Sequence, residues 1–309
     1  LHSFPTRRSS DLGNHNMLMI GPPGAGKTMI AKRIPTILPP LTKEESMELT
    51  KLYSIVGGLN ANQPLILERP FREVHHTTTT SALIGGGLIP RPGEISLADK
   101  GVLFLDEIAE FQKPVLEMLR QPLEEHFIKI IRNRGVYHFP AEFLLVAAMN
   151  PCPCGNYPDL NKCLCTSTQI QAYLSKISQP LLDRIDICVE AERVAYEDLQ
   201  GAREESSKDI RERVIMARER QKERYKGESI TTNSQLNAEK IKQYCILGSE
   251  EEKMMRQAFE KLNLTARMYH KILCVARTIA DLEGEEKIGL AHLREATGYR
   301  TLDKKYWGR

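Results

Sequence analysis

The chain has 309 residues, enough for two domains with separate cores, and its 41% hydrophobic and 27% charged residues are ordinary for a globular protein. Its formal net charge of +3 at pH 7 does not by itself indicate nucleic acid as a partner. Its apolar runs, such as Phe143 to Met149, are far shorter than the ~20 residues of a membrane span, and residues 1–12 lack the apolar stretch of a signal peptide. We therefore expect no membrane partner.

The first predicted element is a strand that leads into a glycine-rich turn. After the apolar run Asn16 to Ile20, the segment GPPGAGKT has Walker A spacing and ends in Lys27 and Thr28. Glycines let backbone N–H groups surround phosphate oxygens, the lysine reaches the β- and γ-phosphates, and the threonine holds Mg²⁺. The alternative, a turn without a ligand, is disfavoured because strand, loop and Lys-Thr pair are all present. We expect ATP and Mg²⁺ to bind through this loop, which comprises Gly21, Pro22, Pro23, Gly24, Ala25, Gly26, Lys27 and Thr28.

The connection that follows, residues 52–99, is long for a link between two strands, and such segments are usually functional or carry structure of their own. His75 and His76 could ligate a metal, but no Cys or carboxylate converges on them at metal-ligand spacing, so a polar loop is the favoured interpretation. Three consecutive glycines, Gly85 to Gly87, are typical of a mobile loop.

A second chemical motif, GVLFLDE from Gly101 to Glu107, places two carboxylates at the end of a buried parallel strand. Open α/β sheets bind ligands at that edge. Asp106 would hold Mg²⁺ through water, and Glu107 would orient and deprotonate the attacking water. A strand that merely ends in Asp-Glu is common, but the position of this one after Walker A favours an active site.

Two β-rich runs, Phe127 to Ile131 and Val136 to Phe139, predict a hairpin inserted before the next buried strand. Its turn carries Arg132 and Arg134, which could hold DNA phosphates. Exposed arginines in a turn are common, so a solvated turn without a ligand is the alternative.

The next strand, FLLVAAMN, ends in Asn150, whose amide could contact the γ-phosphate or position water. The alternative is an amide that caps the strand before Pro151. Further along, the segment SQPLLDRID places Arg184 between two aspartates. That arginine is either a surface ion-pair member or a charge donated to the nucleotide of a neighbouring subunit, as arginine fingers are.

Four of the seven cysteines form two C-x-C pairs separated by eight residues. Turn residues between the pairs would let four thiolates surround one Zn²⁺, and we favour this interpretation over reduced loop cysteines and over disulfides. The candidate zinc ligands are Cys152, Cys154, Cys163 and Cys165. The three other cysteines lie in apolar stretches and are assigned to the core: Cys188, Cys245 and Cys274. An odd cysteine count together with a nucleotide site predicts a cytoplasmic location.

The pattern of apolar residues along the sequence changes near residue 193. Before it, strand-like runs alternate with helical stretches, which predicts an α/β domain with a mostly parallel sheet. The predicted strands are Met17 to Ile20, Val102 to Leu105, Phe143 to Met149 and Ile187 to Val189. After it, only helical spacing remains, which predicts an all-α domain. The expected helices are Asp198 to Lys226, Asn237 to Cys245, Glu250 to Leu262, Thr265 to Leu282 and Leu290 to Thr297.

Six segments between Gly13 and about Lys305 together resemble the ComM/YifB family, in the magnesium-chelatase-like branch of the AAA+ ATPases. They are GNHNMLMIGPPGAGKT, HHTTTTSALIGGGLIPRPGEISLADKGVLFLDEI, FPAEFLLVAAMNPCPCG, PLLDRID, TARMYHKILCVARTIADLEG and YRTLDKK. The resemblance implies a P-loop core of three αβα layers over residues 13–192, a helical lid over residues 193–309 and a homo-oligomeric ring, a hexamer. It also implies that Asn150 is sensor 1, that Arg184 acts in trans as the arginine finger, and that Arg267 is sensor 2.

Members of this family begin with a domain that resembles the Lon protease or ribosomal S5 fold, followed by a linker that folds over the adenine base. This sequence reaches Walker A without either segment. Residues 1–12, LHSFPTRRSSDL, resemble translated sequencing-adapter read-through. We therefore expect an artefactual leader, a truncated chain whose authentic part starts near Gly13, and an incomplete adenine pocket.

Two classes of function fit these motifs, and both use Mg²⁺-dependent ATP hydrolysis. In the first, the ring is a DNA translocase, helicase or branch-migration motor whose hairpin arginines grip phosphates, and the resemblance favours this class. In the second, the ring remodels a protein partner, like the chelatase subunit that drives a metal-inserting enzyme. In either class the loop around Gly85 to Gly87 would lie near the ring pore.

Overall fold

A five-stranded parallel sheet forms the centre of the computed structural model, which describes residues 14–59, 64–133, 135–192 and 205–308. The strand order is β2-β5-β8-β1-β9, and because all neighbours are parallel, their carboxyl ends meet at one edge. The strands are β1 (Met17–Ile20), β2 (Phe71–Val74), β5 (Val102–Leu105), β8 (Leu144–Met149) and β9 (Ile187–Glu190). The expected leader at residues 1–12, the expected boundary at residue 193 and Arg134 lie outside the described residues.

Both faces of this sheet are buried, because successive side chains of a strand point to opposite faces. On β5, Leu103 and Leu105 pack into one apolar cluster, whereas Val102 and Phe104 pack into another. The first cluster includes side chains of the helices α5 (Glu94–Leu97), α6 (Lys113–Glu117), α8 (Ser167–Leu174) and α9 (Gln179–Leu182). The second includes side chains of α2 (Lys27–Arg33) and of the C-terminal helices. These three layers confirm the predicted α/β fold and explain why its strands are continuous apolar runs.

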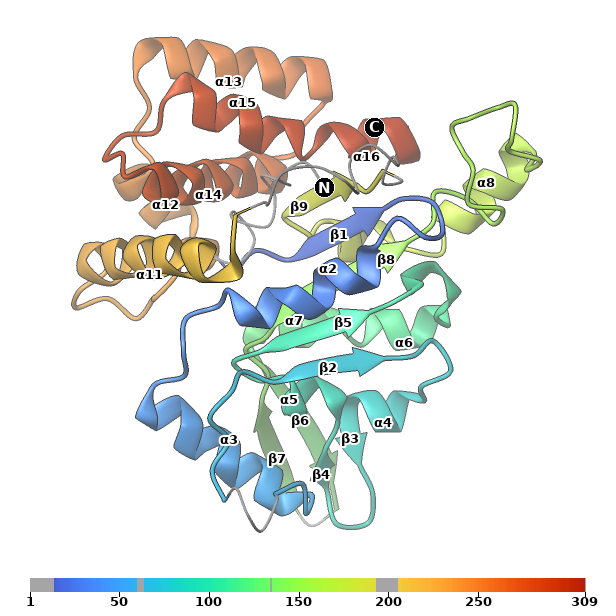
Figure 1. Ribbon diagram of the computed structural model, residues 1–309, viewed down its shortest axis with the longest axis vertical. Coiled ribbons are helices and arrows are strands. Elements are labelled where there is room, and N and C mark those ends of the chain that lie inside the picture. Colours follow the sequence, from blue (N-terminus) through green and yellow to red (C-terminus); the bar gives the residue numbers. More distant parts are fainter. Residues whose placement is uncertain (1–13, 60–63, 134, 193–204, 309) are drawn as a thin grey trace.

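A helical region follows the sheet and lies on the side of β9 and β1 (Figure 1). Its central helix, α14 (Ala266–Glu283), packs against three α-helices and one 3-10 helix of this region. The other helices that match the predicted ones are α11 (Ser207–Arg224), α12 (Ala238–Tyr244), α13 (Ser249–Leu262) and α15 (Leu290–Gly298). A further helix that the sequence did not predict, α16 (Thr301–Trp307), packs against β9 and α8. Among the described residues, no helix combines the length and the hydropathy that a membrane span requires.

Two small antiparallel sheets lie together beyond the β2 edge of the main sheet (Figure 1). One pairs β3 (Gly85–Gly86) with β4 (Arg91–Pro92), and the other pairs β6 (Phe127–Arg132) with β7 (Gly135–Pro140), the hairpin that the sequence predicted. The long segment of residues 52–99 thus carries structure of its own, as expected. The remaining elements are α3 (Lys43–Ile55), α4 (Thr80–Ile84), α7 (Arg120–Glu125) and the short 3-10 helices η1 (Ile34–Thr36), η2 (Ile108–Glu110) and η3 (Asn233–Gln235).

Candidate nucleotide site

The Walker A loop leaves the carboxyl end of β1 at Gly21 and turns into α2. A side chain on Gly21 would collide with the chain after β9, because its Cβ would lie 2.1 Å from the carbonyl oxygen of Ala191. Gly24 and Gly26 have φ angles of +80° and +74°, a conformation that other residues rarely adopt, and open space lies beside both. The glycines therefore occur where the backbone must turn sharply and leave room for a ligand.

Lys27 is the buried cation of this loop, with only 9% of its surface exposed. Its ammonium donates hydrogen bonds to the carbonyl oxygens of the first two loop residues, at 2.5 and 2.9 Å, and to Asn150 Oδ1 at 3.1 Å. Burial lowers the pKa of Lys27, and the carboxylates of Asp106 and Glu107 oppose that shift. Since the hydrogen-bond acceptors are neutral oxygens, the ammonium charge can still be paired with a phosphate.

The two predicted magnesium ligands are in direct contact. Thr28 Oγ1 donates a hydrogen bond to Asp106 Oδ2 at 2.7 Å, and the Glu107 N–H donates to Asp106 Oδ1 at 2.9 Å. Hydroxyl and carboxylate oxygens are the ligands that Mg²⁺ prefers, so this donor set fits the ion. The side chain of Glu107 is 53% exposed, which leaves its carboxylate accessible to water.

His76 is a neighbour of Glu107 that the sequence did not link to it. Its Nδ1 lies 3.6 Å from Glu107 Oε2, and its ring lies beside that of His75, with centroids 4.0 Å apart. His76 follows β2, the strand next to β5, so the available signal was a polar residue just beyond a strand that borders the DE motif. Within the described part of the chain, the cluster of three or more His, Cys, Asp or Glu side chains that could hold a metal ion is the set of loop cysteines, and it does not include this histidine pair.

Arg184 and Arg267 meet at the amino ends of the parallel strands, which is the opposite end of the sheet from the Walker loop. The Arg184 guanidinium lies 2.6 Å from Glu124 Oε1, and Arg267 donates a hydrogen bond to the same oxygen. Hydrogen bonds from Arg267 and Arg184 hold the pKa of Glu124 below its usual value. Arg184 is only 7% exposed and also donates to the backbone carbonyl oxygens of Arg120 and Pro180. The two arginines and Glu124 line a cleft of about 680 Å³, which we call the arginine edge.

The structure does not bring the arginine edge to the Walker loop of the same chain. The Asp186 N–H donates to the carbonyl oxygen of Asn16, which fixes this edge at the start of β1 and β9. Lys27 follows the far end of β1, and a four-residue strand spans about 13 Å. Arg267, predicted as sensor 2, therefore does not reach the nucleotide loop of its own chain.

The predicted DNA contact lies on a third surface. Arg132 ends β6, and a Cβ on Gly86 would lie 3.1 Å from its guanidinium, so the two small sheets touch. Beside them, the side chains of Leu88 and Ile89 are 99% and 76% exposed. We call Leu88, Ile89 and Arg132 the hairpin surface; Arg134, the other predicted contact, lies outside the described residues.

The four loop cysteines converge directly after Asn150. Their Sγ atoms all lie within 4.8 Å of one another, and the structure has all seven cysteines as free thiols. The remaining three are buried, as predicted: Cys188, Cys245 and Cys274.

Comparison with known proteins gives the family. A profile described as magnesium chelatase, subunit ChlI, matches residues 9–199, and a profile of the ChlI C-terminal region matches residues 204–300. Competence protein ComM of Haemophilus influenzae is 46% identical over 292 residues, 94% of this chain and 56% of that protein. The uncharacterized protein YifB of Escherichia coli is 43% identical over 297 residues, 94% and 57% of the two proteins. An uncharacterized protein of Mycobacterium tuberculosis is 39% identical over 289 residues, 93% and 57%.

This chain thus spans a little more than half the length of the curated relatives that it matches. The two profiles together extend over most of the chain, including both the sheet and the helical region. The resemblance drawn from the sequence motifs is confirmed: the chain belongs to the magnesium chelatase ChlI family of AAA+ ATPases, with ComM and YifB among its homologues.

Proposed function

We propose that this chain hydrolyses ATP with Mg²⁺ and is the motor of a ring that moves along DNA. One observation carries the proposal: five polar side chains meet at the carboxyl ends of β1, β5 and β8, the edge at which open α/β sheets bind ligands. They are Lys27, Thr28, Asp106, Glu107 and Asn150. With ATP as substrate and thiols that need reducing conditions, the motor would work in the cytoplasm.

Each of these side chains has a role that its contacts support. Lys27 would bind the phosphates, and Asn150, which accepts a hydrogen bond from it, would orient the terminal phosphate or the water. Thr28 and Asp106 would hold Mg²⁺, which supplies positive charge beside the phosphates. The accessible carboxylate of Glu107 would orient water and accept its proton.

The ring is supported by the position of the arginine edge. Because Arg184 and Arg267 lie at the opposite end of the sheet from Lys27, a head-to-tail contact between chains would set the arginine edge of one against the Walker loop of the next. Repeated contacts of that kind close into a ring, and six is the number that the family resemblance favours. Arg184, and with it Arg267, would then stabilise the charge that develops during phosphoryl transfer in the neighbouring chain.

The hairpin surface suggests what the ring acts on. Arg132 is an exposed cation at a hairpin end, and several copies around a pore would offer a series of phosphate contacts without reading bases. A second candidate is a motor that remodels a protein partner, which the exposed apolar side chains of Leu88 and Ile89 favour because they would suit a polypeptide better than DNA.

The test is ATP hydrolysis by the purified chain, with and without Mg²⁺, and with single-stranded, duplex or branched DNA. We expect hydrolysis that requires Mg²⁺ and increases when DNA is added. A chain that hydrolyses no ATP would contradict the proposal as a whole. Hydrolysis that none of the three DNAs alters would reject DNA as the substrate and favour the protein-remodelling motor.

A further inference from the structure

The loop of residues 152–165 holds four sulfur atoms in an arrangement that suits a metal ion. The Sγ of Cys152 lies 3.4 Å from that of Cys154 and 3.8 Å from that of Cys163, and the last two lie 3.6 Å apart. The Sγ of Cys165 lies within 4.8 Å of the other three. The two sulfur atoms of a disulfide would be only about 2.05 Å apart. Four thiolates around a tetrahedral Zn²⁺, each about 2.3 Å from the ion, would be about 3.8 Å apart.

Hydrogen bonds within the loop support the same arrangement. The Tyr157 N–H donates to Cys152 Sγ at 3.4 Å, which would offset part of a thiolate charge. The Asn156 side-chain amide donates to the carbonyl oxygens of Cys154 and Lys162, at 3.3 and 3.4 Å. Asn156 therefore ties the first C-x-C pair to the residue that precedes the second.

The loop lacks an apolar core of its own. Within residues 152–165 the structure has no helix or strand, and the side chains of Leu160 and Leu164 are 80% and 89% exposed. A 14-residue segment that buries so little apolar surface needs another source of free energy to offset the conformational entropy that it loses on ordering. In small irregular segments, binding of a structural metal can provide that free energy.

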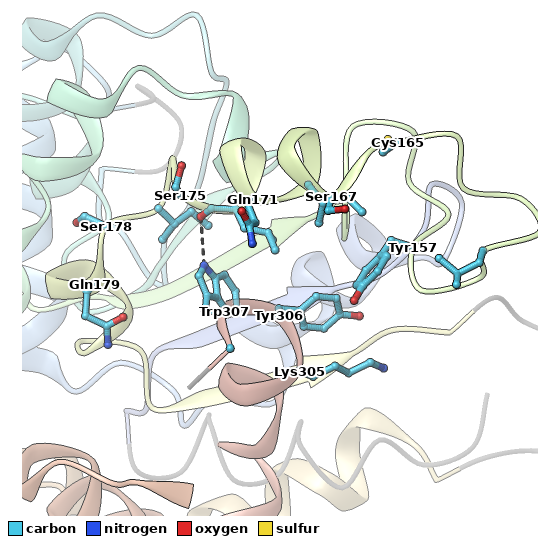
Figure 2. A pocket seen from close by; sticks show the side chains of 15 residues that line it. Tyr157, Cys165, Ser167, Gln171, Ser175, Ser178, Gln179, Lys305, Tyr306 and Trp307 are labelled. Atoms are coloured by element: carbon cyan, nitrogen blue, oxygen red, sulfur yellow. Dashed lines mark hydrogen bonds between the residues drawn. The ribbon is translucent and has the colours of Figure 1, made fainter.

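The loop touches the nucleotide end of the sheet. Gly155 has a φ of +78°, and a Cβ there would lie 2.5 Å from the ring of Pro23 in the Walker loop. On its other side, the ring of Tyr157 meets that of Tyr306 of α16 edge to face, with centroids 6.2 Å apart (Figure 2). The Tyr306 hydroxyl in turn donates to Glu190, the last residue of β9, at 2.7 Å. The loop thus lies between the Walker loop and the last helix.

We propose that one Zn²⁺ binds to the four thiolates of this loop, Cys152, Cys154, Cys163 and Cys165, and that the metal-bound loop is a brace that holds the Walker loop in place. The bracing role depends on the proposed nucleotide site, whereas the proposal that zinc binds does not. Metal content and nucleotide affinity therefore test the two halves separately.

The zinc half is tested by elemental analysis of the purified chain, which needs no variant. We expect one equivalent of zinc per chain. Replacing two ligands, in Cys163→Ser with Cys165→Ser, should remove it, whereas the core substitution Cys245→Ala should leave it. A wild-type chain without zinc after purification and after incubation with Zn²⁺ would overturn the site.

The brace half is tested with Gly155→Ala, which adds a methyl group against Pro23 and leaves all four thiolates in the chain. This variant should retain zinc and bind a non-hydrolysable ATP analogue severalfold more weakly. The matched control is Gly227→Ala, because Gly227 also has a positive φ, of +86°, but no atom lies within 4 Å of its added Cβ. Unchanged nucleotide affinity in Gly155→Ala would overturn the brace. A zinc-loaded wild-type chain that binds no nucleotide would contradict the proposed function and the brace together, with the zinc site standing.

Discussion

The two ends of the parallel sheet carry buried cations in opposite electrostatic settings. At the carboxyl end, the ammonium of Lys27 is held by neutral carbonyl and amide oxygens. At the amino end, Arg184 pairs with Glu124, and Lys271 of α14 lies 2.5 Å from Asp186. A buried charge without a hydrogen-bonded counterion attracts an anion, whereas a paired charge is kept at a fixed position. The first end is therefore suited to bind phosphates, and the second to present a positioned arginine to another molecule.

The largest effect should come from the carboxyl end. Lys27→Ala should abolish ATP binding, because no other cation is hydrogen-bonded within that loop among the described residues. Glu107→Gln should bind ATP normally and hydrolyse it about 10²- to 10⁴-fold more slowly, because an amide cannot accept the proton of water. Nucleotide titration and steady-state hydrolysis separate the two results.

The matched control is Glu110→Gln, which alters an exposed carboxylate on η2, three residues after Glu107. It should hydrolyse ATP at the wild-type rate. Normal hydrolysis by Glu107→Gln would show that this carboxylate is not the base.

Substitution at the amino end of the sheet should have the next largest effect, and it should change the rate of ATP hydrolysis without changing nucleotide affinity. Arg184→Ala should lower the turnover rate about 10³-fold while nucleotide affinity stays unchanged, because Arg184 lies far from the Walker loop of its own chain. Arg211→Ala on α11, a surface arginine bonded to the Thr36 carbonyl oxygen, is the control and should keep full turnover. If Arg184→Ala weakened nucleotide binding as strongly as Lys27→Ala, the proposal that the carboxyl end binds the nucleotide and the amino end acts on the neighbouring chain would be wrong.

A smaller effect is expected at the hairpin surface, which belongs to neither end. Replacing Arg132 and Arg134 together with alanine should leave basal hydrolysis intact and flatten the salt dependence of DNA binding. For every phosphate that the variant no longer binds, the logarithmic salt slope should fall by about 0.9 on duplex DNA and about 0.7 on single strands. Binding measured at several salt concentrations gives the slope, and a double variant with the wild-type slope would mean that DNA, if bound, is held elsewhere.

The smallest predicted effect concerns pH and the amino end. His15 is fully buried, and its Nε2 lies 2.8 Å from Thr278 Oγ1 of α14. Burial lowers the pKa of His15 from 6.5 to about 4; the carboxylate of Asp186 opposes the shift, and the cations Lys271 and Arg218 add to it. The folded chain therefore keeps His15 neutral where the unfolded chain would protonate it.

The free energy of unfolding therefore carries no penalty from His15 above about pH 6.5. It decreases as the pH falls toward 4, by up to about 3 kcal/mol, because the unfolded chain binds a proton that the folded chain does not. Unfolding experiments from pH 7 to pH 4 should show a shallower loss in His15→Gln than in the wild type. His138→Gln, on the exposed side of β7, is the control and should follow the wild-type profile. Parallel profiles for His15→Gln and wild type would contradict the prediction.

The sequence predicted the carboxyl end of the sheet better than the amino end, and the reason is physical. β1, β5, β8 and β9 are buried on both faces and are therefore continuous apolar runs, which local patterns reveal. β2 escaped prediction because it is an edge strand with Arg72 and Glu73 at its centre and only one fully buried residue. Walker motifs are local too, so Lys27 and Asp106 could be proposed as site residues from spacing alone.

Contacts between distant residues could not be predicted in the same way. Glu124 joins Arg267 across 143 positions, and nothing in the local sequence marks it as the partner of two arginines. His76 meets Glu107 only because β2 and β5 are neighbours in the sheet. Helix α16 was missed because its burial depends on contacts with β9 and α8, which are distant in the sequence.

The most direct test of catalysis shared between two ends of different chains is a mixture of two inactive variants. Arg184→Ala keeps an intact Walker loop, and Lys27→Ala keeps an intact arginine edge. In a randomly mixed equimolar ring, about a quarter of the interfaces would combine the two intact parts. We expect the mixture to hydrolyse ATP at a measurable fraction of the wild-type rate, although each variant alone does not. If mixtures shown to co-assemble stayed inactive, Arg184 would be a structural ion-pair residue, and the proposal that neighbouring chains complete each other's sites would be contradicted.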